Sequence, residues 1–426
     1  MPGLIKFSPV RGHTDPVTYS LPPVPEKRLA VRLTKDALRQ VRGGHPWVYD
    51  QAINSVSDSD AAPGTLAVLF DDKRNFAGIG LWDPESPIRI RMLHAGKPRN
   101  IDDEFWTELV SKAVALRSTL EPRGTTAMRL IHGENDGFGG LIVDRYDSTL
   151  VVKVYSASWL PHLNSVLDAL NTVVAPERVV LRLGRNAAAD SAVIDAGLSD
   201  GQALVGTLPT EPVMFTENGL TFEADVVHGQ KTGHFLDQRD NRQFIRSRST
   251  DARVLDVFSC TGGFSVYAAA GGAALVHSVD LAAPAIETAK RNMSHNSALV
   301  SKAKHRTSVG DAFEVMDELA GAGEQYDIVV IDPPSFASRA RERDGAIRAY
   351  RKLTELAVPL VRSGGRLFQA SCSSRITEDD LASTVYAAMR SNGREVHNDQ
   401  RFGHAIDHPI TFSEGRYLKA ITLELD

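Results

Sequence analysis

The sequence predicts an α/β protein in which a small β-rich domain and a central α+β domain precede a Rossmann-like domain. Two observations predict the last of these. Strand and helix patterns alternate regularly from about His228 to the end of the chain, which is typical of a doubly wound parallel sheet. Within that part, Val254 to Asp280 reads as a buried strand, a glycine turn, a helix and a second strand that ends in an acid. This order opens a Rossmann-like unit.

The parts before residue 228 carry different patterns. Residues 1–26 are expected to be a poorly ordered extension, since prolines punctuate them. Residues 27–100 alternate short apolar runs such as RLAVRL and FAGIGLW with turns, which predicts a barrel-like β domain. Residues 101–227 combine helical spacing at 102–120 with strand patterns such as GLIVDRY and TLVVKVY. This mixture predicts an α+β domain without an obvious catalytic set.

Composition excludes several classes of protein. The chain has 426 residues, a formal net charge of −5 and two cysteines, Cys260 and Cys372. Two cysteines cannot form a disulfide framework, and they fit a reducing, cytoplasmic setting. No apolar run is long enough to cross a membrane. The near-balanced charge means that a nucleic-acid partner has to be argued from local basic patches.

The glycine turn indicates which ligand the Rossmann-like domain binds. The turn reads Ser-Cys-Thr-Gly-Gly, not the G-x-G-x-x-G that admits a dinucleotide pyrophosphate. Asp256 beside it would repel a pyrophosphate but attract the cationic amine of S-adenosylmethionine, and Asp280 suits a ribose diol. An αβ turn that binds nothing is the alternative, which the downstream motifs disfavour. The expected cofactor residues are Asp256, Phe258, Cys260, Thr261, Gly262, Gly263 and Asp280.

Two further strand ends carry polar side chains. Asp311 follows the third predicted strand, where it either accepts from an adenine amino group or caps a helix, and the two interpretations are equally good. The strand at residues 328–331 runs into Asp332-Pro333-Pro334-Ser335-Phe336. The prolines stiffen this loop, so that Asp332 can bind a cofactor or base edge while Phe336 supports a base ring. A merely structural turn would not need both side chains.

Cys372 follows another strand, within Ser371-Cys372-Ser373. A free cysteine is most often an inert core residue, but this one ends a strand at the edge where Gly262, Asp280 and Asp332 are expected to meet. A thiolate there can attack C6 of cytosine and make C5 nucleophilic toward a methyl sulfonium. Asp332 would stabilise the charge that develops at N3. Cys260, inside the cofactor turn, is interpreted as a lining residue.

Two basic segments are candidates for RNA contact. One follows the proline loop and includes Arg339 and Arg341, which with Pro333, Pro334 and Phe336 would hold the target nucleotide. The other starts the β-rich domain, where Arg39 and Arg42 precede Trp47, a pattern that tracks phosphates and stacks on bases. A solvated charged surface is the alternative for both, and it is about equally good for the second.

With these motifs in hand, the chain resembles the RlmI type of bacterial S-adenosylmethionine-dependent large-subunit (23S) rRNA methyltransferases. The resemblance covers nearly everything after residue 27. It rests on HPWVYDQAI, IHGENDGFGGLIVDRY, HGQKTGHFLDQRDNR, FSCTGGFSVYAAAGGA, DPPSF, SCSS and DHPITFSEGRYLK, in that order.

The resemblance implies a PUA domain, a central domain and a class I methyltransferase domain, with S-adenosylmethionine as donor and no metal. It implies a 5-methylcytosine product, Cys372 as nucleophile and often a homodimer. Gln238, inside the HGQKTGHFLDQRDNR motif, is added to the expected cofactor residues.

One position departs from the pattern. Ser335 stands where other cytosine-C5 RNA methyltransferases place a second cysteine and where RlmI-type proteins commonly carry lysine, so product release needs another group. Related proteins with KTGxFLDQR and DPPxF motifs modify guanine N7 instead. Two alternatives therefore stay open: methylation of another base position, and a non-catalytic RNA-binding module that keeps S-adenosylmethionine as a structural ligand.

Overall fold

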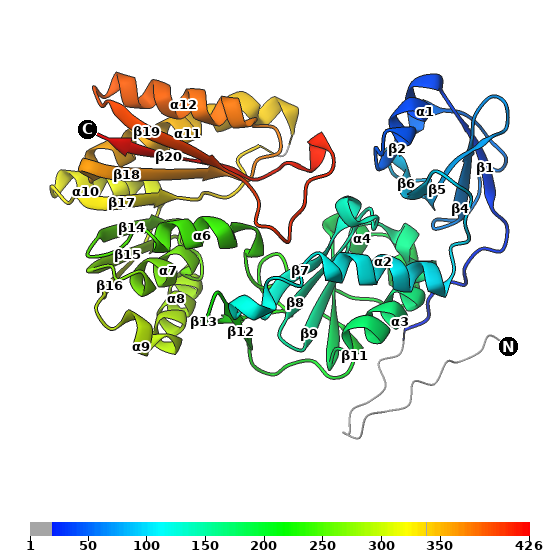
Figure 1. Ribbon diagram of the computed structural model, residues 1–426, viewed down its shortest axis with the longest axis horizontal. Coiled ribbons are helices and arrows are strands. Elements are labelled where there is room, and N and C mark those ends of the chain that lie inside the picture. The colour runs from blue at the N-terminus through cyan, green and yellow to red at the C-terminus, as the bar shows by residue number, and fades with distance from the viewer. Residues whose placement is uncertain (1–18, 338) are drawn as a thin grey trace. The chain divides into compact units, whose positions relative to one another are not determined.

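The computed structural model describes residues 19–337 and 339–426 (Figure 1). Residues 1–18 of the predicted extension lie outside the described residues. Two compact units divide the chain. The first comprises the chain up to Thr119, Thr126–Val213 and Ala224–Gly233, and the second comprises Leu120–Thr125, Met214–Glu223 and His234–Asp426.

The first unit begins with a six-stranded sheet in the order β2-β6-β5-β4-β1-β3. The pair β1 and β4 is parallel, and the other pairs, including β1 with β3, are antiparallel. Alternate residues of β1 are buried, as a strand with one face on a core requires. The elements are β1 (Leu29–Leu33), α1 (Lys35–Arg42), β2 (Trp47–Tyr49), β3 (Ile53–Val56), β4 (Leu66–Phe70), β5 (Phe76–Trp82) and β6 (Ile88–Ala95).

The rest of the first unit is built on a five-stranded sheet in the order β11-β10-β9-β8-β7, on which α2 and α3 pack against each other. Its core holds a buried cluster of aromatic rings that includes Trp106, Phe138 and Trp159. The elements are α2 (Asp103–Ala115), β7 (Ala127–His132), β8 (Leu141–Tyr146), β9 (Thr149–Val154), α3 (Leu163–Val174), β10 (Arg178–Leu183), α4 (Arg185–Ala188), α5 (Ser191–Asp195) and β11 (Ala203–Val205).

The second unit is built on a seven-stranded sheet in the order β16-β15-β14-β17-β18-β20-β19. Its strands are β14 (Arg253–Val257), β15 (Leu275–Asp280), β16 (Lys304–Val309), β17 (Tyr326–Ile331), β18 (Val361–Ser371), β19 (Val396–Phe402) and β20 (Lys419–Leu425). The first five are parallel, and β20 runs antiparallel to both β18 and β19. The strand order reverses direction between β14 and β17, which makes the carboxyl ends of these strands the expected ligand site.

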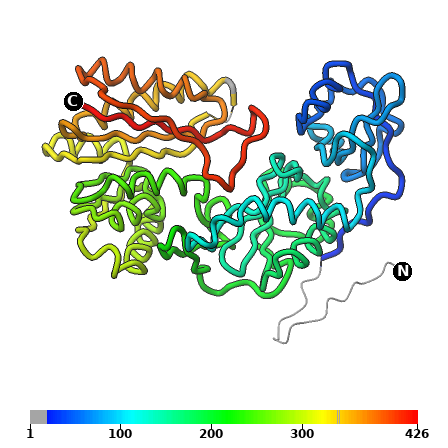
Figure 2. Tube along the Cα trace, in the orientation of Figure 1, coloured from blue at the N-terminus to red at the C-terminus, as the bar shows by residue number. Residues whose placement is uncertain are grey.

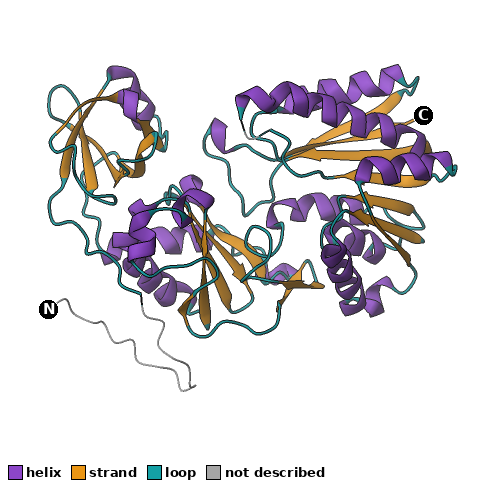
Figure 3. Ribbon diagram, turned by 180° about the vertical axis from the view of Figure 1, so that it is seen from behind, coloured by secondary structure: helices purple, strands orange, loops and turns teal. Residues whose placement is uncertain are grey.

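Helices cover both faces of this sheet (Figures 1 and 3). The helices α6, α7 and α8 pack together, as do α10, α11 and α12. They are α6 (Arg239–Arg246), α7 (Gly263–Ala270), α8 (Ala283–His295), α9 (Ser297–Val300), α10 (Ala312–Gly321), α11 (Arg343–Ala357) and α12 (Glu378–Ser391). A two-stranded hairpin, β12 (Val213–Glu217) with β13 (Leu220–Ala224), precedes them. After β19 the chain makes a long loop before it returns as β20, drawn red in Figure 2.

The predicted fold class is confirmed: a β-rich sheet, an α+β sheet and a Rossmann-like sheet follow one another along the chain. Strands β14 and β17 are buried nearly throughout, as parallel strands covered on both faces must be. Within the described residues, no helix has both the length and the apolarity needed to span a membrane.

Candidate functional site

The turn after β14 holds a strained backbone. Phe258 and Cys260 have φ values of 63° and 48°, in the left-handed region that side chains larger than glycine rarely adopt. Gly262 follows with φ 78°, and a Cβ there would lie 2.8 Å from the Cβ of Ala289 on α8. Only glycine allows both this conformation and this helix packing. Thr261 and Gly263 complete the turn, so that the N-terminus of α7 faces the strand ends.

Asp280, at the end of β15, is tied to that turn. One carboxylate oxygen accepts from the backbone N–H of Cys260 at 2.8 Å, and the other accepts from that of Ala282 at 2.9 Å. These bonds fix the carboxylate beside the turn and leave lone pairs for a diol. Leu281, next in the chain, is 71% exposed. An apolar side chain that protrudes directly after the acid suits the face of an adenine ring.

Asp256 is a buried carboxylate on β14. One oxygen accepts from the Ser265 hydroxyl at 2.6 Å, whereas the other is buried and has no hydrogen-bond partner among the described residues, like the Ser259 hydroxyl in the turn. Burial raises the pKa of Asp256 to about 7, although the hydrogen bond from Ser265 acts to lower it. Two orphaned polar groups at the cofactor turn fit a ligand that brings a cationic amine.

The other expected cofactor residues lie around this edge. Asp311 follows β16 and caps α10, because its carboxylate accepts from the N–H of Phe313 at 2.8 Å. Gln238 is buried just before α6, and its side-chain oxygen accepts from the Asn241 amide at 2.5 Å. The cap accounts for Asp311 without a ligand, so its contact with adenine stays a prediction.

The proline loop and Cys372 come together at the ends of β17 and β18. These strands are hydrogen-bonded neighbours, with Ile331 beside Gln369. The Cys372 thiol, half-buried, lies 3.9 Å from the carbonyl oxygen of Pro333. The backbone N–H of Asp332 points to the carbonyl of Val257 at the end of β14. The thiol therefore lies against the loop that carries Asp332, as the sequence predicted.

A network of hydroxyl groups holds the cysteine segment to that loop. The Ser373 oxygen accepts from the Ser335 hydroxyl at 3.2 Å and from the N–H of Phe336 at 3.0 Å. Tyr350 of α11 bonds both Ser373 at 2.9 Å and Ser371 at 2.8 Å, and its ring packs on that of Phe336. The two serines that flank Cys372 thus share one buried tyrosine, which fixes the direction of the thiol.

Carboxylates surround Cys260 instead. Burial raises the pKa of its thiol to about 11, and Asp280, Asp332 and Asp256 add to this shift. Asp280 ends β15 and Asp332 follows β17, so both lie at the same edge of the sheet as this turn. A thiol in such surroundings stays protonated and unreactive near neutral pH.

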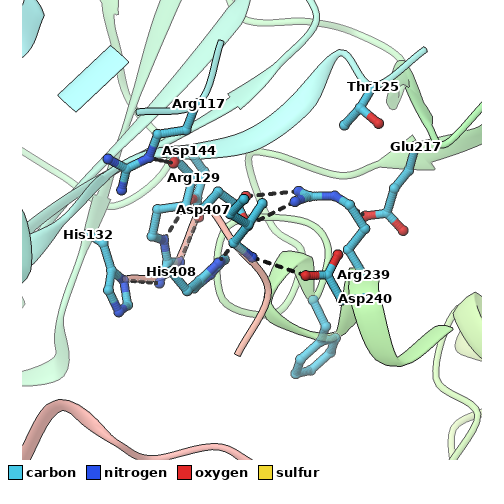
Figure 4. Close-up of polar contacts among 12 residues, drawn as sticks. Arg117, Thr125, Arg129, His132, Asp144, Glu217, Arg239, Asp240, Asp407 and His408 are labelled. Carbon is cyan, nitrogen blue, oxygen red and sulfur yellow. Dashed lines mark hydrogen bonds and ion pairs between the residues drawn. The ribbon is translucent and has the colours of Figure 1, made fainter. Parts of the chain in front are cut away.

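Buried ion pairs connect α6 to the loop between β19 and β20 (Figure 4) and to β12. Arg239 of α6 makes two bonds of 2.8 Å with Asp407, and Arg242 binds Glu217 of β12 at 2.7 Å. Burial opposes ionisation, yet Arg239 and His408 hold the pKa of Asp407 well below its usual range. Removing one partner of such a pair costs about 3–5 kcal/mol. The HGQKTGHFLDQRDNR and DHPITFSEGRYLK motifs therefore meet to anchor this loop.

The first unit has a buried ion pair of its own, also drawn in Figure 4. Arg129 of β7 binds Asp144 of β8 at 2.8 and 2.9 Å, and Thr232 donates to the same carboxylate at 2.6 Å. Their burial and mutual saturation make this pair a structural feature of the central sheet.

The two predicted RNA segments differ in their surroundings. Arg39 is paired with Asp36 and Arg42 with Asp71, each at 3.0 Å, and the Trp47 indole donates to Glu134 at 3.0 Å. Arg339 and Arg341 are exposed beyond the proline loop. Within the described residues neither of these two guanidinium groups makes an ion pair.

Two side chains that bear on the chemistry were not singled out from the sequence. Tyr350 is buried, and its role is visible only once α11 is packed against β18. Lys419, the first residue of β20, is 2% exposed, and no local pattern distinguishes it within the DHPITFSEGRYLK motif. Among the described residues no group of three or more histidine, cysteine or acidic side chains is arranged to hold a metal ion.

Comparison with protein families gives two matches. Residues 144–399 match the S-adenosylmethionine-dependent methyltransferase family, and residues 31–95 match the PUA-like domain. The first match spans more than half of the chain.

Curated relatives match over nearly their whole length. A protein of Deinococcus radiodurans named Ribosomal RNA large subunit methyltransferase is 44% identical over 412 residues, which is 96% of this chain and 100% of that protein. A protein of Photobacterium profundum named Ribosomal RNA large subunit methyltransferase I is 35% identical over 395 residues, 92% and 98% of the two chains.

Solved structures share the fold. A Streptococcus mutans protein described as a SAM-dependent methyltransferase aligns with a TM-score of 0.75 and 21% identity, over 93% of this chain and 99% of that one. A methyltransferase complexed with SAH aligns with a TM-score of 0.76 and 22% identity over the same shares. At these identities the likeness concerns the fold alone.

Proposed function

The chain belongs to the S-adenosylmethionine-dependent methyltransferases of the ribosomal RNA large subunit methyltransferase family, and on that premise we propose that it forms 5-methylcytosine in large-subunit (23S) rRNA. The two family matches give S-adenosylmethionine as the methyl donor and a PUA-like domain at residues 31–95. The base, the atom and the covalent route are the proposal.

One observation carries the proposal: the Cys372 thiol lies against the Pro333 carbonyl, inside the loop that presents Asp332. A methyl transfer to a base nitrogen needs no thiol, because the nitrogen lone pair attacks directly. Methylation at C5 of cytosine does need one, since C5 becomes nucleophilic only after a nucleophile adds to C6. The position of Cys372 beside a base-holding loop therefore favours the carbon product.

The reaction proceeds by addition, methyl transfer and elimination. The Cys372 sulfur bonds to C6 while the protonated carboxyl group of Asp332 donates to N3, which stabilises the negative charge that develops there. C5 would then take the methyl group of the bound sulfonium, which would leave as a neutral thioether. A base removes the C5 proton, and the electrons of that C–H bond restore the double bond as the C6–S bond breaks. Ser335, bonded to Ser373, holds the loop during these steps.

The same edge of the sheet fits the donor. We assign the ribose hydroxyls to Asp280 and the methionine amine to the neighbourhood of Asp256, whose second oxygen is unsatisfied among the described residues. Thr261, Gly262 and Gly263 would let the backbone approach closely. Gln238 and Asp311 remain proposed contacts at the margin of this site.

RNA that contains 5-fluorocytidine tests the covalent step. Fluorine at C5 cannot leave as a proton does, so the adduct of Cys372 with C6 should persist and migrate as a protein–RNA species on a denaturing gel. We expect Cys372→Ala to abolish this species and to lower turnover on normal RNA at least about 10⁴-fold, as loss of a nucleophile does elsewhere.

Cys260→Ala is the matched control, since it removes the other thiol and should leave the adduct intact. A Cys372→Ala protein that methylates RNA at near-native rate would exclude the thiol route and promote methylation at a nitrogen such as guanine N7. RNA binding without any methyl transfer by the wild-type protein would leave only the non-catalytic alternative.

A homodimer, a cytoplasmic location and the division of the chain at residues 100 and 227 are also part of the proposal. Cys260 and Cys372 are not joined in a disulfide, which is compatible with a reducing compartment.

A further inference from the structure

Lys419 is a lysine buried where the nucleophile segment ends. Its backbone lies opposite Ser371 in the antiparallel pairing of β18 with β20. Its ammonium nitrogen donates to the carbonyl of Ser373, and to that of Tyr417 at 2.9 Å. Since the backbone is level with Ser371 and the nitrogen reaches the Ser373 carbonyl, the side chain passes the backbone of Cys372, close enough for the charge of Cys372 to act on the nitrogen.

Neither hydrogen-bond acceptor of Lys419 is a carboxylate. Two carbonyl oxygens do not neutralise an ammonium group, and a buried cation without a charged partner is costly. Burial accordingly lowers the pKa of Lys419 to about 8, and the charges of Cys372 and then Asp380 act in the opposite direction. Asp380 is already engaged, because it binds Arg343 and the N–H of Thr377 at the start of α12. The thiolate of Cys372 is the remaining anion for this cation.

Other titratable groups face the same space from the neighbouring elements. Asp332 comes from the end of β17, Tyr350 from α11 and His404 from the loop before β20. Burial raises the pKa of Tyr350 to about 12 and lowers that of His404 to about 4. Tyr350 and His404 are therefore neutral near pH 7, and neither can neutralise a thiolate. Lys419 is the group here that favours it.

We propose that Lys419 takes the thiol proton of Cys372 in its neutral amine form and holds the resulting thiolate as an ion pair, ready to attack C6. The step is a proton transfer from sulfur to nitrogen, which turns a neutral thiol and amine into a thiolate and an ammonium. The same ammonium stabilises the thiolate when it leaves C6 at product release. This inference rests on the proposed function, in which Cys372 is the nucleophile.

Site-resolved alkylation tests the ion pair without RNA. The full-length protein is treated with iodoacetamide between pH 5 and 10, and the rate at each cysteine is followed by peptide mass spectrometry. We expect the rate at Cys372 to rise with a midpoint at least one pH unit below the ordinary thiol value of about 8.5. A wild-type midpoint at or above 8.5 would overturn the proposal without any variant.

Variants then assign the effect to the amine. Lys419→Met keeps the length of the side chain and should raise the Cys372 midpoint by at least one unit, which slows alkylation at pH 7 about tenfold. Lys419→Arg keeps the charge and should hold the midpoint low. The exposed Lys290 of α8, paired with Glu287, gives the control Lys290→Met, which should change nothing. Calorimetric binding of S-adenosylmethionine checks that each variant is folded.

The outcomes separate this inference from the proposed function. A midpoint that Lys419→Met leaves unchanged, in a protein that still forms the fluorocytidine adduct, rejects the role of Lys419 alone. A low midpoint that depends on Lys419, in a protein that forms no adduct, keeps the ion pair and rejects the covalent mechanism.

Discussion

Cys260 and Cys372 both follow parallel strands of one sheet, yet their surroundings differ in the sign of the nearby charge. Cys260 lies in the turn after β14, where its backbone N–H is bound by Asp280 and three carboxylates face the thiol. Cys372 lies after β18, where hydroxyl groups fix its neighbours and the amine of Lys419 binds the carbonyl of Ser373, the next residue. The surroundings of Cys260 disfavour a thiolate, whereas those of Cys372 favour one.

This difference teaches how one sheet edge can serve two reactants. The carboxylates at β14 and β15 suit a donor that carries a sulfonium and an amine, both cationic. The same carboxylates would hinder a nucleophilic thiol, because they raise the pKa of any thiol among them. Cys372, the proposed nucleophile, lies two strands away, and Asp332 follows β17 between the two regions.

Asp332 lies between the two regions, and its replacement should have the largest effect among the variants that test this comparison. We expect Asp332→Ala to lower turnover about 10²–10³-fold, because loss of an electrostatic stabiliser at the reacting base commonly costs that much. Binding of S-adenosylmethionine should persist in part, since Asp256 and Asp280 remain. Single-turnover rates and calorimetry measure the two quantities. Loss of cofactor binding with an intact rate at saturating cofactor would place Asp332 on the cofactor side.

The buried Asp256 predicts how cofactor binding depends on pH. Its pKa of about 7 means that the free protein holds a proton there below neutrality, whereas a cationic ligand favours the ionised carboxylate. Affinity for S-adenosylmethionine should therefore rise with pH between 5 and 7, by up to about tenfold per unit, and level off above. Calorimetry across this range measures the slope, and Asp256→Asn should flatten it.

Asp280→Ala is the matched control for that slope. Its loss should weaken S-adenosylmethionine by a few kcal/mol at most, at every pH, because a charge-assisted contact to the ribose disappears. The slope should remain, since Asp256 is untouched. Unchanged affinity in Asp280→Ala would remove this acid from the cofactor site.

The sequence predicted the parts of the molecule that depend on local pattern. Strand–helix alternation and a glycine turn suffice for the Rossmann-like sheet, because strand ends and tight turns leave marks on neighbouring residues. The same reasoning placed Cys372 and the DPPSF loop at one edge, since parallel strands share the direction of their carboxyl ends. The short distance from the Cys372 thiol to Pro333 agrees with that expectation.

The contacts that tune the site were not predictable in this way. Lys419 reaches Ser373 across 46 positions of sequence, and Tyr350 reaches Ser371 from a different helix. Such contacts depend on the register of β20 against β18 and on helix packing, neither of which leaves a local mark. The charged start of the first unit shows the converse limit. The basic run there predicts an RNA surface or a solvated charged surface equally well, and composition does not show that Asp36 and Asp71 pair with two of its arginines.

The basic side chains give the smallest expected effect, and they extend the comparison to the RNA. Arg339 and Arg341 follow the proline loop in the chain, and they make no ion pair among the residues that the structure describes. Replacing both with alanine should weaken RNA binding roughly tenfold and reduce the slope of log affinity against log salt by about 1.4, since each contact with single-stranded phosphate contributes about 0.7.

Arg39→Ala with Arg42→Ala should change affinity less than about threefold, because each of these arginines already shares its charge with a carboxylate. Filter binding of rRNA fragments at several salt concentrations measures both double variants, and cofactor affinity should be the same in each. A larger loss from the Arg39 and Arg42 pair would place the main phosphate contacts on the first unit, and equal slopes in all proteins would mean that both patches are solvated surfaces.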